Sequence, residues 1–332
     1  MAVIYVIEQG AVVRKRGGRI LVEKDHETLS EIPLRQTDSI AVYGNVQVTT
    51  QALSELLERG IPLALYTRHG RLKGHLTPEV SKNVTLRVAQ YRLALDEPAA
   101  LGMAKAVVRA KVRNAWRLLA DYRSNYPSSV LAAACEAMVR AEENAESAEG
   151  HAELLGIEGA AAAAYFGAFG ELNRSDLPFD GRRKHPATDP INGLLSLGYT
   201  LVMNEIRAVV EGVGMEPHLG FLHKVDYGRP SLALDLLEPF RSPAVDRLTL
   251  RLVNERVLTG EDFGKRVSGA GAGSVVLAPD SLRKYLEQYE AGVANGRGDG
   301  TKSLREEWRA DVERLAAAIR ESGVFVPYCE GE

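Results

Sequence analysis

The sequence predicts an α+β protein with two domains, a small N-terminal β-rich domain followed by a larger all-α domain. In the first ~75 residues, short runs of β-branched and aromatic residues alternate with glycine-containing turns, which is typical of strands. From about residue 78 onward, apolar residues instead recur at spacings of three and four, which indicates amphipathic helices. We therefore expect a β domain at 1–77, a linker and first helix at 78–98, and a helical domain at 99–332.

The β domain is expected to contain strands, one helix and a second hairpin. The apolar residues of the helix, about Thr50–Arg59, fall on one side of it, and Gly60 ends it. The hairpin is expected around His69–Arg71, where the glycine favours a turn. The strands are expected at Ala2–Ile7, Arg19–Val22, Ser39–Val42 and Pro62–Tyr66.

The second domain is expected to consist of helices joined by loops. Clusters of turn-forming residues at 173–190 and 213–217 predict two of these loops. Two helices follow from about Asp280, on either side of a polar stretch, Ala294–Lys302, that we expect to be mobile. The other helices are expected at Lys82–Ala94, Ala99–Tyr122, Ser129–Glu149, Gly159–Leu172, Asp189–Gly212 and Ala244–Leu258.

The composition limits the classes of protein to which the chain can belong. Its 332 residues are 45% hydrophobic and 26% charged, as in a globular protein long enough for two domains. The sequence has no run of about 18 apolar residues that could span a membrane, and its start alternates like a strand rather than like a signal peptide. Cys135 and Cys329 have neither disulfide nor zinc-ligand spacing. We therefore expect a cytoplasmic protein without membrane attachment.

Positive charge is concentrated in one predicted helix, although the net charge of −3 argues against a generally basic nucleic-acid binder. Four basic residues fall four apart in this helix, and no acid occurs among them. On a helix this spacing aligns them on one face, which we call the basic stripe: Lys105, Arg109, Arg113 and Arg117. The stripe is equally compatible with a solvated face and with a surface that binds the phosphates of DNA.

A second basic cluster lies in the predicted loop at 173–190. Loops often carry function, and this one could hold a phosphate backbone, but a solvated loop fits the sequence equally well. The members that we treat as candidate DNA contacts are Arg182, Arg183 and Lys184, with Arg174 and His185 nearby.

A histidine and two acids form the first candidate site for chemistry. Asp235 and Glu238 lie in an otherwise apolar run, and buried acids require something that compensates their charge. On a helix the two would share a face, and Pro239 predicts that such a helix ends at Glu238, because a proline disfavours helical geometry in the residue before it. A turn at 227–230 could bring His223 back toward both carboxylates.

Two kinds of partner could compensate these acids. Pairing with Arg229 or Arg241, with His223 as an ordinary core residue, is the interpretation that spacing alone favours. A divalent metal ion is the alternative. One imidazole with two or three carboxylate oxygens suits Mn²⁺ or Mg²⁺ better than structural Zn²⁺, and such an ion would stabilise charge on a phosphodiester.

Glu158 is a third candidate acid. It opens a predicted apolar helix and lies between two glycines that allow close approach of another backbone or a ligand. On a helix it shares a face with Ala162, Tyr165 and Phe169. Taken alone, Glu158 is better explained as a first-turn acid that the helix dipole favours.

Four segments together resemble the CRISPR adaptation integrase, the metal-dependent nuclease known as the first of the CRISPR-associated proteins. They occur in the order of that family, and the family's N-terminal β domain and C-terminal α domain agree with this chain along essentially its whole length. Several motifs in order are more specific than any one of them, so the resemblance favours the metal site over the arginine pairing. The segments are Gly156-Ile-Glu158-Gly159, Asp189–Tyr199, Gly220-Phe-Leu-His223 and Ser231–Arg241.

The resemblance implies that the helical domain is catalytic, with Glu158, His223 and Glu238 as ligands of Mg²⁺ or Mn²⁺ and Asp235 as an additional catalytic acid. It implies a DNA endonuclease and integrase that inserts short DNA fragments into a CRISPR array by transesterification. The implied partners are DNA, a second copy in a homodimer, and a small dimeric ferredoxin-like CRISPR-associated protein. Two alternatives remain, a catalytically silent DNA-binding scaffold of the same fold and a small-molecule metallohydrolase.

Overall fold

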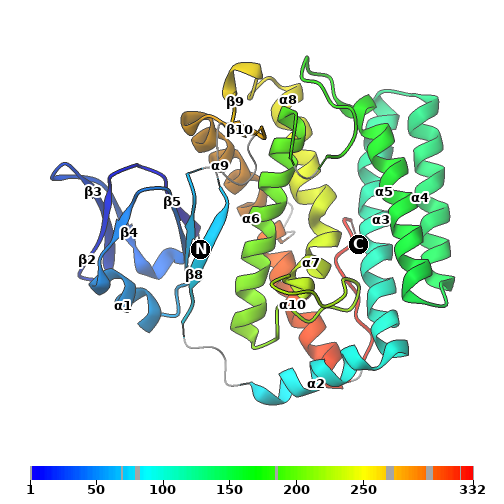
Figure 1. Cartoon of the computed structure of the whole chain (residues 1–332), viewed down its shortest axis with the longest axis horizontal. Helices are drawn as coiled ribbons and strands as arrows, with labels where there is room; N and C mark the ends of the chain where they lie inside the picture. Colours follow the sequence, from blue (N-terminus) through cyan, green and yellow to red (C-terminus); the bar gives the residue numbers. More distant parts are fainter. Residues whose placement is uncertain are drawn as a thin grey trace. The chain divides into compact units, whose positions relative to one another are not determined.

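The computed structural model describes the whole chain except residues 1, 69, 79–82, 184–185, 267–272, 297–301, 322 and 332. By its internal contacts the chain divides into two compact units. Unit 1 contains Met1–Val80 and Leu277–Ala294, and unit 2 contains Ser81–Val276 and Asn295–Glu332. The predicted fold class is confirmed, since a β-rich N-terminal region precedes a larger helical region (Figure 1).

Unit 1 is built from two four-stranded sheets. In the first, with the order β1-β5-β7-β8, the first three strands are parallel and β8 is antiparallel to β7. In the second, with the order β4-β3-β2-β6, β2, β3 and β4 pair antiparallel and β6 is parallel to β2. The strands are β1 (Ala2–Val6), β2 (Val12–Arg16), β3 (Arg19–Lys24), β4 (Glu27–Pro33), β5 (Thr37–Tyr43), β6 (Gln47–Val48), β7 (Leu63–Tyr66) and β8 (Leu72–Leu76).

The core of unit 1 forms where apolar residues of both sheets meet the helix α1 (Thr50–Glu58). Val13 and Ile20 of one sheet, Ile40 and Leu63 of the other, and Leu56 of α1 are all buried in one cluster. The helix α9 (Pro279–Ala294) also belongs to this unit, and its Glu290 accepts a hydrogen bond from the Tyr5 hydroxyl at 2.7 Å. The helical periodicity of α9 did not indicate this grouping.

Unit 2 consists mainly of helices. The long helix α3 packs against α4, α5 and the segment that follows α7, and α6 packs against α7, α8 and α10. In Figure 1, α3, α4 and α5 run alongside one another. The helices are α2 (Val84–Leu95), α3 (Glu97–Asn125), α4 (Ser129–Ser147), α5 (His151–Phe169), α6 (Pro190–Val213), α7 (Ser231–Leu237), α8 (Arg247–Asn254) and α10 (Leu304–Glu321).

Each predicted strand and helix has a counterpart, and the structure corrects three details. The helix predicted to start at Gly159 begins at His151, because neither Gly156 nor Gly159 interrupts it, so Glu158 lies about two turns inside α5. Strands β2, β4 and β6, and a short sheet of β9 (Phe263–Lys265) with β10 (Val275–Leu277), were not predicted. The expected mobile stretch Ala294–Lys302 lies largely outside the described residues.

The third correction concerns Glu238. Its backbone is helical, with φ −54° and ψ −45°, although it precedes Pro239. The α-helix does end at Leu237, but the chain continues as a 3₁₀ turn, Glu238–Phe240, and then as a π-helical segment, Arg241–Asp246. Proline disfavours the helical region for the residue before it without forbidding that region, and the chain changes helix type at this point.

Asn114 of α3 braces this irregular segment from behind. Its side-chain amide donates hydrogen bonds to the carbonyl oxygens of Pro239, at 2.7 Å, and Tyr328, at 3.1 Å, and its oxygen accepts from the backbone N–H of Glu330 at 2.8 Å. The Tyr328 ring stacks on Phe240, with centroids 5.1 Å apart. Buried polar groups that are fully hydrogen-bonded make such a position rigid, so the backbone that carries Glu238 is firmly held.

The helices of the described residues differ from membrane-spanning helices. None of them combines the length and the apolar character that crossing a bilayer requires. The two cysteines, Cys135 and Cys329, form no disulfide.

Candidate active site

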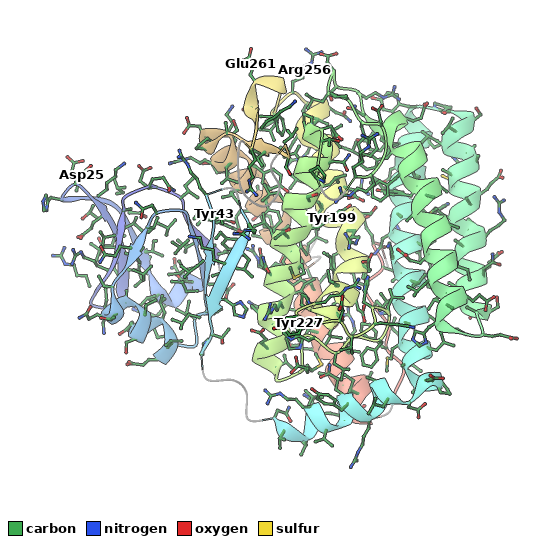
Figure 2. The ribbon with its side chains drawn as sticks, in the orientation of Figure 1. Asp25, Tyr43, Tyr199, Tyr227, Arg256 and Glu261 are labelled. Carbon is green, nitrogen blue, oxygen red and sulfur yellow. The ribbon has the colours of Figure 1, made fainter. Side chains whose placement is uncertain are left out.

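Asp235 fixes the position of His223. Its carboxylate accepts hydrogen bonds from the backbone N–H groups of Phe221, Leu222 and His223 at 2.6, 2.9 and 3.0 Å, and it lies 2.7 Å from the His223 Nδ1 atom. A carboxylate only accepts, so in the neutral imidazole Nδ1 carries the proton and Nε2 keeps its lone pair. An exposed loop that carries Tyr227 connects His223 to α7 (Figure 2). The loop turns back, so His223 lies beside Asp235 of α7.

Gly220 allows this close approach. A Cβ atom at this position would lie 2.6 Å from Oδ2 of Asp235 and 2.8 Å from the carbonyl carbon of Ser231. Both distances are shorter than a real Cβ atom tolerates. Only glycine therefore lets the backbone segment before His223 pass this close to the first turn of α7.

Glu238 faces the other nitrogen of the imidazole. His223 Nε2 lies 3.9 Å from Glu238 Oε1, and Arg241 binds both oxygens of the same carboxylate, with N–O distances of 2.7 and 2.9 Å. Burial alone would raise the pKa of Glu238, but Arg241 and Lys111 outweigh burial and hold this pKa well below its ordinary value. Glu238 is thus buried and ionised, which is one requirement of a metal ligand.

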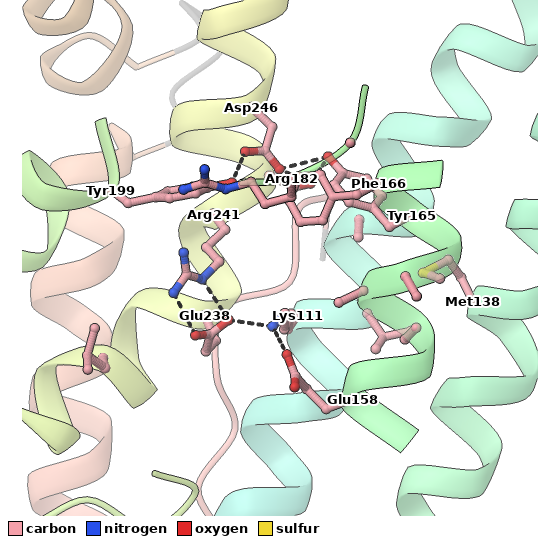
Figure 3. Close-up of a pocket in the computed structure, with 18 of the residues that line it drawn as sticks. Lys111, Met138, Glu158, Tyr165, Phe166, Arg182, Tyr199, Glu238, Arg241 and Asp246 are labelled. Atoms are coloured by element: carbon pink, nitrogen blue, oxygen red, sulfur yellow. Dashed lines mark hydrogen bonds and ion pairs between the residues drawn. The ribbon is translucent and has the colours of Figure 1, made fainter. Parts of the chain in front are cut away.

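Lys111 of α3 joins Glu238 to Glu158 of α5. Its Nζ atom lies 2.7 Å from Glu238 Oε2 and also contacts Glu158 Oε1 (Figure 3). Two acids that are 80 residues apart in the sequence therefore converge on one cationic nitrogen. The arginine pairing considered from the sequence is present at Glu238, to Arg241, whereas Asp235 pairs with His223 instead.

These side chains line one end of a cavity of about 890 Å³ in unit 2. At the other end, Asp246 accepts hydrogen bonds from the hydroxyls of Tyr165, at 2.7 Å, and Tyr199. Burial raises the pKa of Asp246 and, together with the neighbouring carboxylate, raises the pKa of both tyrosines well above their usual range. The phenols are therefore fixed donors. The guanidinium of Arg241 lies over the Tyr199 ring, 4.4 Å from its centroid.

The side chains at this end of the cavity suit a divalent cation by their chemistry but not in their present positions. Among the residues that the structure describes, no three histidine, cysteine, aspartate or glutamate side chains lie close enough together to hold an ion as they stand. The Lys111 ammonium is nevertheless a positive charge contacted by Glu158 and Glu238, and the Nε2 atom of His223 lies beside Glu238. Oxygen ligands with one imidazole suit Mg²⁺ or Mn²⁺, so these residues fit such an ion once Lys111 withdraws.

The basic stripe does not line this cavity. Arg109 lies 3.4 Å from Glu146 and Arg113 lies 3.8 Å from Glu142, both acids of α4, while Lys105 donates to the Glu146 carbonyl oxygen. Arg117 donates to the carbonyl oxygen of Glu330 at 2.6 Å. The stripe is therefore partly neutralised by acids of a neighbouring helix, which its own sequence did not reveal.

The second basic cluster is divided by the structure. Arg182 lines the cavity, where it donates to the side chains of Asn192 at 2.8 Å and Ser196 at 3.1 Å. Arg183 is exposed. Lys184 and His185 lie outside the described residues. The Arg174 guanidinium lies over the Tyr126 ring, 4.0 Å from its centroid.

The sequence alone did not single out Lys111, Tyr199 or Asp246. Lys111 comes two residues after the stripe residue Arg109 and looked like part of a basic helix. An offset of two residues, however, places Lys111 on roughly the opposite face of the helix. That offset was the available signal. Asp246 gave none, because its partners come from other helices.

The sequence is similar to a family of known proteins. The sequence profile of the family described as "CRISPR associated protein Cas1" matches residues 4–291. A CRISPR-associated endonuclease Cas1 of Rhodospirillum rubrum is 37% identical over 298 residues, which cover 86% of this chain and 85% of that protein. Another, of Thermus thermophilus, is 38% identical over 292 residues, covering 87% and 84% of the two chains.

Solved structures agree with the fold. A CAS1 protein from Thermotoga maritima superposes with a TM-score of 0.83 at 22% identity, covering 98% of this chain and 99% of the other. A casposase bound to its integration product superposes with a TM-score of 0.85, also at 22% identity, covering 100% and 94%. At such identities these likenesses concern the fold alone.

Proposed function

This chain belongs to the Cas1 family of CRISPR-associated proteins, and from that premise we propose that it is a metal-dependent DNA endonuclease and integrase. It inserts short DNA fragments into a CRISPR array by transesterification. In this step the 3′-hydroxyl oxygen of the fragment forms a new P–O bond while the bond to the departing array oxygen breaks. The proton lost by the attacking hydroxyl balances the proton gained by the departing one.

The observation that carries this proposal is the convergence of Glu158 and Glu238 on one cationic nitrogen beside His223 Nε2. These three residues would hold Mg²⁺ or Mn²⁺. When bound, such an ion supplies charge neutralisation at the phosphodiester and favours attack by an oxygen nucleophile. In-line displacement at phosphorus needs positioning and electrostatic stabilisation more than covalent help, and the donor set matches that need.

The surrounding residues have supporting roles. Asp235 is a positioning residue, because its hydrogen bond with Nδ1 keeps the Nε2 atom of His223 directed toward Glu238. Arg241 keeps Glu238 ionised. Arg182 brings a second guanidinium to the cavity, where a phosphate of the bound DNA would find a charge-assisted donor.

We further propose that the chain acts as a homodimer, in the cytoplasm, with DNA and a small dimeric ferredoxin-like partner. The solved structures of similar fold include a chain of a Cas6-RT-Cas1–Cas2 complex, with a TM-score of 0.84 and 23% identity, which covers 36% of that longer chain. That assembly and the DNA-bound casposase support the proposal by likeness of fold. The basic stripe and Arg182, Arg183 and Lys184 are the proposed contacts to the DNA backbone.

The test is strand cleavage and joining on DNA that carries a CRISPR repeat. Wild type, Glu158→Ala and His223→Ala are incubated with Mn²⁺ or Mg²⁺ and a fragment with free 3′-hydroxyl ends. We expect metal-dependent products from wild type and none from either variant. Equal products from all three would overturn the catalytic assignment. DNA binding without products in wild type would indicate the scaffold, and no DNA binding would leave a small-molecule metallohydrolase.

A further inference from the structure

We infer that Lys111 is an internal counter-ion of the active site, which takes the place of the metal ion between Glu158 and Glu238 and competes with the ion for both carboxylates. This inference rests on the proposed use of a metal by these residues. It adds a residue that tunes how tightly the ion is held.

The contacts of Lys111 carry the inference. Its Nζ atom lies 2.7 Å from Glu238 Oε2 and contacts Glu158 Oε1, so one ammonium serves two carboxylates from different helices. The Glu238 side chain is 3% exposed and that of Lys111 19%, so water screens this pair weakly. Glu238 also has Arg241 as a bidentate partner. Glu158 is connected to Glu238 through its ion pair with Lys111.

The place of Lys111 on its helix separates it from the basic stripe. Lys111 is two residues from both Arg109 and Arg113, a rotation of about 200° around an α-helix. The stripe faces Glu142 and Glu146 of α4, whereas Lys111 lines the cavity with Glu158 and Glu238. A basic residue on this side of α3 is aimed at the proposed site.

Charge explains why an ammonium and a metal ion exclude each other here. Two carboxylates held close together in a poorly solvated place repel, and a cation between them relieves the repulsion. Lys111 supplies one positive charge in the metal-free protein and a divalent ion would supply two. An ion bound between Glu158 and Glu238 would occupy the space that the Lys111 Nζ atom fills between these carboxylates and would repel the ammonium. The flexible four-carbon stem of lysine lets the ammonium withdraw, at the cost of its two ion pairs.

The competition predicts opposite effects of one substitution. Replacing Lys111 with methionine keeps most of the volume of the stem and removes the charge. The metal-free protein then loses the bridge between Glu158 and Glu238 and becomes less stable. The metal-bound protein no longer has to displace or repel an ammonium, so the ion binds more tightly.

The experiment measures Mn²⁺ affinity by isothermal titration calorimetry and, separately, thermal unfolding without metal. Wild type is compared with Lys111→Met and with Lys105→Met, a lysine of the same helix that contacts Glu146 instead. We expect Lys111→Met to bind Mn²⁺ about tenfold more tightly, to unfold at a lower temperature without metal, and to gain more from added Mn²⁺ than wild type. Lys105→Met should match wild type in Mn²⁺ affinity.

Equal or weaker Mn²⁺ binding by Lys111→Met would overturn the inference, since Lys111 would then be an ordinary ion pair or a support for the ion. If the methionine variant does not fold, Lys111→Gln serves the same purpose, because it is neutral and can still donate a hydrogen bond. The proposed function fails separately: a wild type that binds Mn²⁺ but joins no DNA contradicts the integrase, while the calorimetry still decides the role of Lys111.

Discussion

The Nδ1 atom of His223 lies 2.7 Å from Oδ1 of Asp235, and the same carboxylate accepts three backbone N–H groups from residues 221–223. Asp235 therefore holds both the backbone and the ring of His223, and it is not among the residues that line the cavity with Glu158 and Glu238. Asp235 and Glu238 are neighbours in the sequence with different tasks. Asp235 orients His223, a proposed metal ligand, and Glu238 is itself a proposed metal ligand.

Replacing Asp235 with asparagine tests this division. The amide NH₂ group would face backbone donors that need an acceptor, so we expect the free energy of unfolding to fall by about 2 to 3 kcal/mol. Mn²⁺ affinity should fall about 10- to 100-fold, because the orientation of His223 is lost. Urea denaturation and calorimetry measure the two effects. Asp226→Asn, in the exposed loop after His223, is the matched control, and equal results for both variants would contradict the role of Asp235.

Gly220→Ala should destabilise the protein by about 1 to 3 kcal/mol, because the new Cβ would collide with Asp235 and with the backbone of Ser231. Urea denaturation again provides the measurement. Gly212→Ala in α6 is the control, since its Cβ meets nothing within 4 Å and alanine favours a helix. A Gly220→Ala protein as stable as wild type would show that the loop before α7 yields easily.

Reversing the charge of Arg113 tests the basic stripe. If the stripe binds DNA phosphates, Arg113→Glu weakens DNA binding for all sequences and lowers the slope of log affinity against log salt by about 1. Fluorescence anisotropy at several salt concentrations measures this slope. Arg140→Glu, on the exposed side of α4, is the control. An unchanged slope for Arg113→Glu would mean that Arg113 does not contact the DNA phosphates.

Asp311 should make stability depend on pH. Burial raises its pKa to about 6 from the ordinary 3.8, although Arg314 and the Tyr328 N–H stabilise the ionised form and so lower this pKa in part. Well below pH 4 it is protonated in both the folded and the unfolded state. As pH rises toward 6 the unfolded chain loses this proton first, so the native state loses up to about 3 kcal/mol of relative stability, and no more above 6. Wild type minus Asp311→Asn, measured by urea denaturation from pH 4 to 7, should show this decline. A flat difference would contradict it.

Much of the fold could be predicted from the sequence because local patterns determine it. Strand β3 has a run of β-branched and apolar residues, and α3 has apolar spacing along nearly its whole length. Strand β4 was missed because its sequence, Glu-Thr-Leu-Ser-Glu-Ile-Pro, is largely exposed at the edge of its sheet and shows no clear apolar alternation. The tertiary partner β3 makes β4 a strand, and no local signal reveals that partner.

The site was predictable only in part, for the same reason. The chain order of Glu158, His223 and Glu238 could be read, and the structure brings Glu238 close to His223 and, through Lys111, to Glu158. Contacts between distant segments could not be read. Spacing could not assign Asp235 to His223, nor place Lys111 of α3 between two acids. Each of these depends on how the helices pack, which residue periodicity does not specify.

The central claim is that Glu158 and Glu238 jointly hold the ion on which DNA joining depends. Its most direct test is the rate of Mn²⁺-dependent joining by Glu238→Gln, a substitution that keeps the shape of the side chain and removes its charge. The control is Glu261→Gln, because Glu261 is an exposed acid that does not line the cavity (Figure 2). We expect Glu238→Gln to join DNA at least about a hundredfold more slowly than wild type while Glu261→Gln is unaffected. A folded Glu238→Gln protein that joins DNA at the wild-type rate would contradict the claim.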